Sequence, residues 1–239
     1  MITIGVPIYN QNQKFFRECL DSIKNQTYKD FECIILDDGS DKKEEVEKIT
    51  KEFGFKYIYQ ENQGVGAARQ ALVDNASKET EFIAFLSSDD IWDKKFLETM
   101  IKISKQQPGK ILYSTYYIIN ENDEIVRKAD IPGFYDHEDF CVVCFDLAYE
   151  NNMFVNFSTT FFPKEVFEKV QFNKELKFGE DLDFLLKSMK HFKYFLVPEY
   201  LLKYRAVDNL TSRIRHKISE NNEKIIKEVR EYWEKNEKR

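Results

Sequence analysis

The sequence predicts an α/β fold in which a mostly parallel sheet is flanked by helices. Over the first hundred residues, short β-rich apolar runs alternate with segments of helical periodicity, and polar clusters follow the apolar runs. After residue 109 the pattern changes to a hairpin-like pair of runs, which predicts a smaller mixed portion. With 239 residues and 42% hydrophobic content, the chain can bury one large core, so a single domain is the default.

Four strands and four helices are expected in the first half. The strands are apolar runs rich in β-branched and aromatic residues, at residues 2–8, 31–36, 57–59 and 82–86. The helices are segments in which apolar side chains recur every three or four residues, at residues 15–23, 46–53, 67–73 and 96–103. Because strands that alternate with helices pair in parallel, their carboxyl ends should meet at one edge of the sheet.

The second half is expected to mix hairpin, strand and helix. A hairpin joins residues 111–119 to residues 124–128, and a strand at residues 157–162 leads through Pro163 into a short helix at residues 165–170. The remaining expected elements are one helix and two strands, at residues 181–189, 194–197 and 200–205.

The last segment, residues 212–239, carries apolar side chains on one helical stripe, which predicts an amphipathic helix after a single domain at residues 1–211. We expect the stripe to dock on that domain, while basic side chains at residues 213–217 keep a partner or a membrane surface as the alternative. The stripe consists of Ile214, Ile218, Ile225, Val229 and either Tyr232 or Trp233.

Composition and charge bound the function. The net charge of -6 argues against a dedicated nucleic-acid binder, whose usual footprint is a clustered basic face. No apolar run approaches the roughly 20 residues of a transmembrane segment, and no secretory leader precedes the first strand. We therefore expect a cytoplasmic protein, with peripheral contact on the inner face of the membrane left open.

The four cysteines are expected to be reduced. Cys19 and Cys33 fall within apolar helix and strand patterns and should be buried as small hydrophobic side chains. The spacing of Cys141 and Cys144 also permits zinc binding or dithiol cycling, but only His137 lies nearby as a further ligand. Core packing is therefore favoured for this pair.

Four polar clusters fall at the ends of the four predicted strands of the first half. They are Pro-Ile-Tyr-Asn at residues 7–10, Asp-Asp-Gly-Ser at 37–40, Gln-Gly-Val-Gly-Ala-Ala-Arg at 63–69 and Ser-Ser-Asp-Asp at 87–90. In a parallel sheet all four would meet in the crevice beyond the carboxyl ends of the strands, where ligands bind in open α/β sheets. This convergence predicts a binding site.

The first three clusters have the chemistry to bind a nucleotide. The ring of Tyr9 suits stacking on a nucleobase. An ionised carboxylate at Asp37 or Asp38 can only accept hydrogen bonds, so it could accept one from the ring N–H of uracil or thymine. Gly64 permits close backbone approach at a helix start, and Arg69 supplies a cation for phosphate or base. The alternatives are a turn tyrosine, helix capping by the aspartates, and an ion pair for the arginine.

Two acidic clusters have the chemistry for catalysis. Asp89 and Asp90 would repel each other unless a cation lies between them, and Mg²⁺ or Mn²⁺ is commonly held by one or two carboxylates together with substrate phosphates. Far along the chain, Gly179 precedes Glu180 and Asp181 at an expected helix start, where the dipole stabilises negative charge. An ionised acid beside a substrate hydroxyl can act as general base, whereas capping alone is the competing interpretation.

Taken together, these clusters resemble the inverting family 2 glycosyltransferases with the GT-A fold. The resemblance covers roughly residues 1–206, and its motifs occur in the family's order and separations. Besides the five clusters, the stretches Phe-Ser-Thr-Thr-Phe-Phe at residues 157–162 and Glu-Val-Phe-Glu-Lys-Val at 165–170 match the family pattern. The glycine motif follows the third strand and ends in arginine, so the Rossmann oxidoreductase interpretation is rejected.

The resemblance implies a fold and a set of partners. The fold is a Rossmann-like nucleotide-binding sheet at residues 1–107, an acceptor-binding half at residues 108–211 and a C-terminal helix. The partners are a UDP-type or dTDP donor sugar and a glycan or lipid-linked glycan acceptor. The activity is that of a hexosyltransferase-like, inverting enzyme in polysaccharide or glycoconjugate assembly, with Mn²⁺ or Mg²⁺ as cofactor.

The resemblance also implies a role for each site residue. Asp181 is the catalytic base, while Asp90, preferred over Asp89, holds the metal. Glu180 and Ser158 are implied on the acceptor or donor-sugar side. The residues implied in nucleotide binding are Pro7, Tyr9, Asp38, Gly64, Arg69 and Asp89.

Two departures from the family pattern keep other functions open. Ser87 stands where the metal motif commonly has an aspartate, although a branch resembling the spore-coat polysaccharide enzyme also pairs two acids without that residue. After Tyr204 and Arg205, where many relatives carry a histidine, this chain offers only Asp208 as a substitute. The alternative is therefore a non-catalytic nucleotide-sugar-binding module that works through a partner. A nucleotidyltransferase is disfavoured, because no glycine-rich signature follows the first strand.

Overall fold

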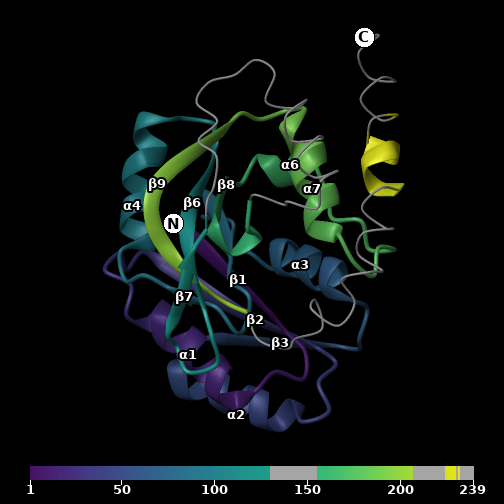
Figure 1. Cartoon of the computed structure of the whole chain (residues 1–239). Coiled ribbons are helices and arrows are strands. Elements are labelled where there is room, and N and C mark those ends of the chain that lie inside the picture. The colour runs from purple at the N-terminus through teal and green to yellow at the C-terminus, as the bar shows by residue number, and fades with distance from the viewer. Residues whose placement is uncertain (130–154, 207–223, 230, 232–239) are drawn as a thin grey trace.

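The architecture comes from a computed structural model that describes residues 1–129, 155–206, 224–229 and 231. Within these residues nine strands form one mixed sheet in the order β3-β2-β1-β4-β8-β6-β9-β5, and β7 pairs with β6 (Figure 1). None of the described helices is long and apolar enough to cross a bilayer.

One half of the sheet is parallel, as the sequence predicts. Its strands are β1 (Ile2–Ile8), β2 (Phe31–Asp38), β3 (Lys56–Gln60) and β4 (Phe82–Phe85). β1 pairs in parallel with both β2 and β4, and β2 pairs in parallel with β3. The carboxyl ends of these strands therefore point to the same edge, which confirms the expected layout of the first half.

The other half of the sheet is mixed. β8 (Thr160–Pro163) runs antiparallel to both β4 and β6 (Ile111–Ile119), and β9 (Tyr194–Arg205) runs parallel to β6. The predicted hairpin is confirmed by β7 (Ile125–Lys128), which runs antiparallel to β6. The outermost strand, β5 (Ile91–Trp92), pairs antiparallel with β9. The strand direction thus reverses between β4 and β8.

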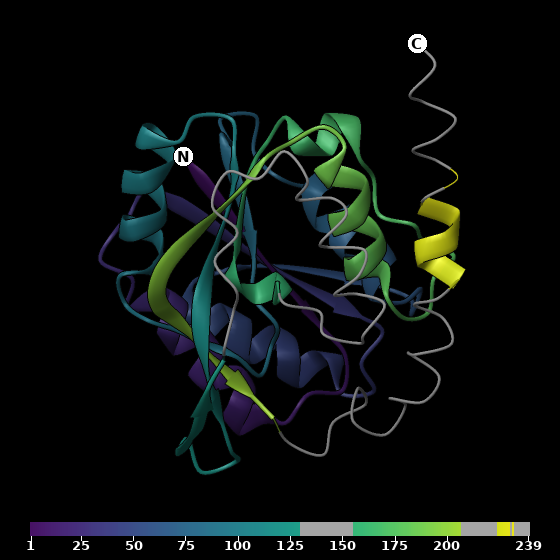
Figure 2. The ribbon, with the colours of Figure 1, turned by 45° about the horizontal axis from the view of Figure 1, so that its top comes forward.

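Helices cover both faces of the sheet, as Figures 1 and 2 show. One hydrophobic cluster contains side chains of α1 (Gln13–Lys24), α2 (Lys43–Phe53) and α4 (Phe96–Gln106). A second cluster, on the opposite face, contains side chains of α3, α6 and α7, which span Val65–Asp74, Val166–Lys169 and Glu180–Met189. Because successive strand residues point to opposite faces, Cys33 and Ile35 join the first cluster, and Ile34 and Leu36 the second.

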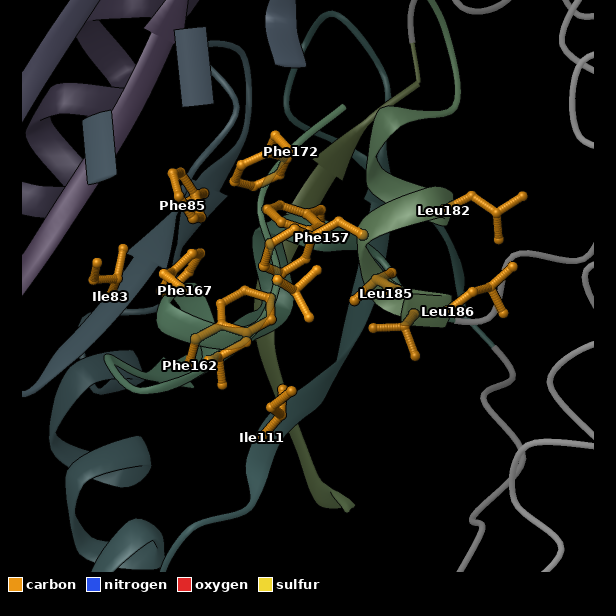
Figure 3. Packing of buried hydrophobic residues seen from close by; sticks show 14 of the residues in the cluster. Ile83, Phe85, Ile111, Phe157, Phe162, Phe167, Phe172, Leu182, Leu185 and Leu186 are labelled. Carbon is orange, nitrogen blue, oxygen red and sulfur yellow. The ribbon is translucent and has the colours of Figure 1, made fainter. Parts of the chain in front are cut away.

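The second cluster is built around phenylalanine rings (Figure 3). Phe172 stacks on Phe184 of α7 at 4.3 Å between ring centroids, and Phe85 of β4 lies 5.4 Å from Phe157. In Figure 3, Leu182 and Leu186 of α7 point away from these rings, yet both are buried. The helical residues 224–229 belong to the same cluster through Ile225, Ile226 and Val229. The Ile225 and Val229 part of the predicted apolar stripe is thus buried on the domain.

Two elements of the second half differ from the prediction. Residues 157–162 do not form one strand, because Phe157–Thr159 is a 3₁₀ turn and β8 begins only at Thr160. The Asn156 side chain accepts from the Ser158 amide at 2.9 Å, a local bond that competes with extended structure. Pro163 accordingly ends β8 and does not start the following helix.

The strands predicted at residues 194–197 and 200–205 are one strand, β9. Its register against β6 shifts after Val197, so that residues 198 and 199 bulge out of the ladder. A proline at position 198 has no N–H to donate there, which explains the bulge. Cys19 and Cys33 are buried and reduced, as expected. Cys141, Cys144 and His137 lie outside the described residues.

Candidate active site

The four strand-end clusters of the first half lie together at one edge of the sheet. The Asn10 amide donates to Ser40 Oγ at 3.0 Å, which joins the end of β1 to the end of β2. The Gln11 side chain donates to Ser88 Oγ at 3.3 Å, which joins the end of β1 to the loop after β4. The convergence predicted from the sequence is therefore confirmed.

Asp38 organises the loop that precedes α3. Its carboxylate accepts from Gln60 Nε2 at 2.7 Å, from the Gln63 amide at 2.9 Å and from the Gly64 amide at 2.8 Å. A carboxylate has about four acceptor positions, so one remains for a ligand. Its neighbour Asp37 is fully buried and accepts from other groups, whereas Asp38, at 4% exposed, is the member of the pair that binds the loop before α3.

The start of α3 comes close to the start of α7. Gly64 has φ 92° and ψ 159°, a backbone conformation essentially reserved for glycine. At Gly66, a Cβ atom would lie 3.0 Å from the Asn173 carbonyl oxygen and 3.3 Å from Glu180 Cβ. The absence of a side chain at Gly66 therefore allows the backbone of α3 to approach the acidic first turn of α7.

A buried ion pair joins the same two helices. Arg69 Nη1 donates to Glu180 Oε1 at 2.6 Å, and both side chains are less than a tenth exposed. The guanidinium lies 4.3 Å from the ring centroid of Phe157, and Nε has no hydrogen-bond partner within the described part of the chain. Burial and the neighbouring charge of Asp181 raise the pKa of Glu180 to about 7, and the Arg69 charge opposes that rise. The ion-pair alternative considered for Arg69 is thus observed, with a partner that sequence spacing did not indicate.

Asp90 is held inside the protein. Its side chain accepts from the Arg205 amide at 3.0 Å and from Ser158 Oγ at 2.8 Å, and the residue is 1% exposed. Burial and the charge of Asp89 raise the pKa of Asp90 well above its usual range. Each carboxylate oxygen accepts one hydrogen bond from the protein, so Asp90 is the more enclosed acid of the pair, and its role as metal ligand stays a prediction.

Asp89 is the more accessible member of the pair. It is partly buried, and burial raises the pKa of its carboxyl, while the Arg205 charge and the Gln11 side chain oppose that rise. Ser158 is 2% exposed, and its Oγ accepts from the Ser87 amide at 3.2 Å. Ser158 therefore supports the turn at residues 87–90, the acidic turn.

The remaining predicted residues lie around these groups. Tyr9 is 53% exposed, so its ring is free to stack on a ligand, and Pro7 lies within β1 opposite Leu36. Asp181, in the first turn of α7, is partly buried and accepts from the Leu182 amide at 2.8 Å.

Two series of contacts connect α7 with the strand ends. One runs from the Asp38 carboxylate to the Gly64 amide and, along α3, from Gly66 to Glu180. The other runs from Glu180 through Arg69 to Phe157, whose neighbour Ser158 binds Asp90. The acidic groups that are remote in sequence are thereby joined into one region.

The donor set of this region fits a sparsely coordinated divalent ion. Among the described residues, no three His, Cys, Asp or Glu side chains cluster closely enough to hold a metal by themselves. The partly exposed carboxylate of Asp89 is an oxygen ligand of the kind that Mg²⁺ and Mn²⁺ accept together with water and substrate phosphates. Asp208 lies outside the described residues.

A cavity of about 380 Å³ opens between α1 and α2 at this edge of the sheet. Asn10, Gln11 and Lys42 contribute polar groups to its lining, and Phe16 and Val46 contribute apolar ones. This volume is in the range of small-molecule sites. Gln11, through its bond to Ser88, connects the cavity with the acidic turn.

Sequence reasoning missed the role of Arg205. The residue drew attention only because no histidine follows it, yet its side chain is fully buried and donates from Nε to the Asp89 carbonyl oxygen at 2.9 Å. The available signal was an arginine at the end of the predicted strand at residues 200–205, since arginine is rarely buried without partners.

Comparison with known proteins places the chain in a family. Residues 3–171 match the family described as Glycosyl transferase family 2. An uncharacterized glycosyltransferase of Methanocaldococcus jannaschii is 31% identical over 227 residues, which cover 90% of this chain and 74% of that protein. The glycosyltransferase GlyA of Streptococcus pneumoniae is 32% identical over 193 residues, which cover 75% of this chain and 27% of that protein.

The fold is also found among solved structures. A fragment of S. aureus TarS, crystallised in complex with UDP-GlcNAc, matches with a TM-score of 0.66 at 19% sequence identity. The match covers 87% of this chain and 59% of that fragment. This likeness supports the GT-A type α/β fold with its mixed, curled sheet. With the family match over more than half of its length, the chain belongs to glycosyl transferase family 2 and is a glycosyltransferase.

Proposed function

We propose that the chain moves a sugar from a nucleotide-diphosphate donor, a UDP-sugar first and a dTDP-sugar second, to a hydroxyl group of a glycan or lipid-linked glycan. The observation that carries the proposal is that a series of contacts joins Asp38, the first turn of α7 and Asp90, the neighbour of Asp89 in the acidic turn. The TarS complex with UDP-GlcNAc supports a donor of this class. The work of the enzyme would be polysaccharide or glycoconjugate assembly, with peripheral contact at the inner membrane face where the acceptor is lipid-linked.

The strand-end residues would bind the nucleotide. The exposed ring of Tyr9 offers a stacking surface for the base, and the remaining acceptor position of Asp38 suits the ring N–H of uracil or thymine. The backbone around Gly64 leaves room for a close ligand, since no atom of the described residues lies within 4 Å of the position of a Cβ atom there. Arg69, on the helix that follows this loop, would contribute positive charge near the diphosphate.

Asp89 would hold Mn²⁺ or Mg²⁺. The metal motif would then consist of two adjacent acids without the aspartate that commonly precedes them, as in enzymes of the spore-coat polysaccharide type. When bound, such an ion stabilises the charge that builds on the departing diphosphate, a Lewis-acid effect typically worth several kcal/mol. Asp90 and Ser158 hold the turn that presents Asp89.

Asp181 would act as the general base. Its position in the first turn of α7 favours negative charge, because the unsatisfied amides of a helix start carry partial positive charge. The carboxylate takes the proton of the acceptor hydroxyl while that oxygen attacks the anomeric carbon. The C–O bond to the diphosphate breaks on the opposite side, so the configuration is inverted.

The test is to replace Asp181 by asparagine and to measure transfer from a panel of UDP-sugars with Mn²⁺, alongside UDP binding by calorimetry. Removal of a general base should lower kcat by about 10² to 10⁴ and leave UDP affinity within about twofold. Asp183→Asn is the matched control, because Asp183 lies on the same helix but pairs with Lys187 at 2.8 Å. Unchanged turnover in Asp181→Asn would remove Asp181 from the mechanism. Tight UDP binding by the wild-type chain with no transfer to any acceptor would instead support the binding-module alternative.

A further inference from the structure

The end of β9 carries a buried arginine to which the proposed mechanism assigns no step. Arg205 has no exposed surface, and its side chain is the largest of those that are fully buried among the residues that the structure describes. Its guanidinium donates from Nε to the Asp89 carbonyl oxygen at 2.9 Å. Its backbone amide donates to Asp90 Oδ1 at 3.0 Å. One residue thus holds both members of the acidic pair, one through its main chain and the other through its carboxylate.

The other side of the guanidinium is fixed to two distant segments. Nη1 donates to Asp123 Oδ1 at 2.6 Å and to the Asn120 carbonyl oxygen at 3.2 Å, both at the tip of the β6–β7 hairpin. Nη2 donates to Glu18 Oε2 of α1 at 2.8 Å. The Phe15 ring covers the flat face, 4.2 Å from the guanidinium carbon. Four N–H···O bonds, to three different segments, therefore define where this group lies.

Geometry makes these bonds interdependent. A guanidinium is planar, and its five N–H groups point in fixed directions. When Glu18 and Asp123 fix the two terminal nitrogens, they also fix the direction of Nε, and with it the position of the Asp89 carbonyl oxygen. A lysine ammonium is a compact charge on a flexible stem, so it cannot transmit position between three partners in this way.

We propose that Arg205 is a positioning residue for donor binding, which sets the place of the Asp89 carboxylate by tying the acidic turn to α1 and to the β6–β7 hairpin. The inference rests on the proposed function, because it takes Asp89 as the group that meets the metal and the diphosphate. Arg205 acts through Asp89 and Asp90, since its side-chain bonds go to protein groups.

The experiment compares UDP binding by calorimetry, with and without Mn²⁺, in the full-length wild-type chain and in Arg205→Lys, together with thermal melting of each. We expect Arg205→Lys to stay folded at 25 °C and to bind UDP in the presence of Mn²⁺ at least tenfold more weakly. Ile2→Ala is the control for lost stability, because Ile2 is fully buried at the opposite end of β1. It should lower the melting temperature and keep the UDP Kd within twofold. Arg17→Lys controls for the chemical change at a partly exposed arginine of α1 that pairs with Glu52.

A second variant guards against a failure of Arg205→Lys to fold. The double substitution of Glu18→Gln and Asp123→Asn removes both anchoring charges at side chains that are 25% and 38% exposed, and it keeps their shapes. Asparagine also tolerates the positive φ of 65° at position 123. This variant should raise the UDP Kd about threefold or more. If the wild-type chain binds UDP and both variants bind it with the same Kd, the positioning role of Arg205 is overturned and the proposed function is not. A wild-type chain that binds no UDP with Mn²⁺ overturns the proposed function, and the role of Arg205 with it.

Discussion

At the residue scale, two adjacent aspartates have different surroundings. Both oxygens of Asp90 accept hydrogen bonds from the protein, and the side chain is almost fully buried, whereas Asp89 is partly exposed. The sequence showed a pair of acids at a strand end, but it could not show which acid faces the ligand. That difference depends on Ser158 and Arg205, which are remote in sequence and adjacent only in the folded chain.

This difference predicts opposite results for the two asparagine variants. Asp89→Asn should leave the free energy of unfolding within about 0.5 kcal/mol, as for a substitution away from the core, and should abolish the gain in UDP affinity that Mn²⁺ provides. Asp90→Asn should instead lower the free energy of unfolding by about 1–3 kcal/mol, because an amide cannot accept at both of its ends. Urea unfolding and UDP calorimetry with and without Mn²⁺ measure the two effects. Equal loss of stability in both variants would contradict the assignment.

At the element scale, helices and strands that depend on local sequence were predicted correctly, whereas those that depend on contacts between distant residues were missed. The buried runs that became β1, β2 and β4 are recognisable locally, because a parallel strand covered on both faces is almost continuously apolar. β5 was missed because it has two residues and pairs only with β9, about 110 positions away. The 3₁₀ turn at Phe157–Thr159 was missed because side-chain bonds to the main chain overrode the strand propensity of threonine and phenylalanine.

The loop before α3 gives a prediction about backbone conformation. Gly64→Ala should lower the free energy of unfolding by about 1–3 kcal/mol, since alanine is strained at φ 92° and ψ 159° even though space is free around it. It should also weaken UDP binding, because relief of that strain moves the amide that Asp38 holds. Gly54→Ala, at the left-handed end of α2, is the control and should lose stability without losing UDP affinity. The idea fails if both variants bind UDP equally well.

At the scale of the whole molecule, side chains of the helical residues 224–229 join the phenylalanine-rich core on the face of α7. Ile225, Ile226 and Val229 are buried in the same cluster as α7, which presents Leu182 and Leu186 on the side away from the rings (Figure 3). The periodicity of the last segment predicted the burial of Ile225 and Val229 but not that of Ile226. It could not identify the covering surface, because that surface is created by other parts of the chain.

Burial of this segment predicts that it contributes to global stability. Ile225→Ala should lower the free energy of unfolding by about 2–5 kcal/mol, the usual cost of removing a large aliphatic side chain from a core. Lys227→Ala, an exposed position on the same helical turn, should change it by less than about 0.5 kcal/mol. Urea denaturation of both variants measures the difference. An equal effect would mean that the segment does not pack on the domain in solution.

The reversal of strand direction between β4 and β8 has a consequence for biosynthesis. A ribosome delivers β4 long before it delivers residues 160–163, so the nascent polypeptide presents an unpaired flank along β4 during that interval. The hydroxyl of Ser158, which braces the acidic turn, arrives just ahead of the strand that closes this flank. The acidic turn therefore acquires its support late in translation, and a product terminated near residue 107 should be prone to self-association.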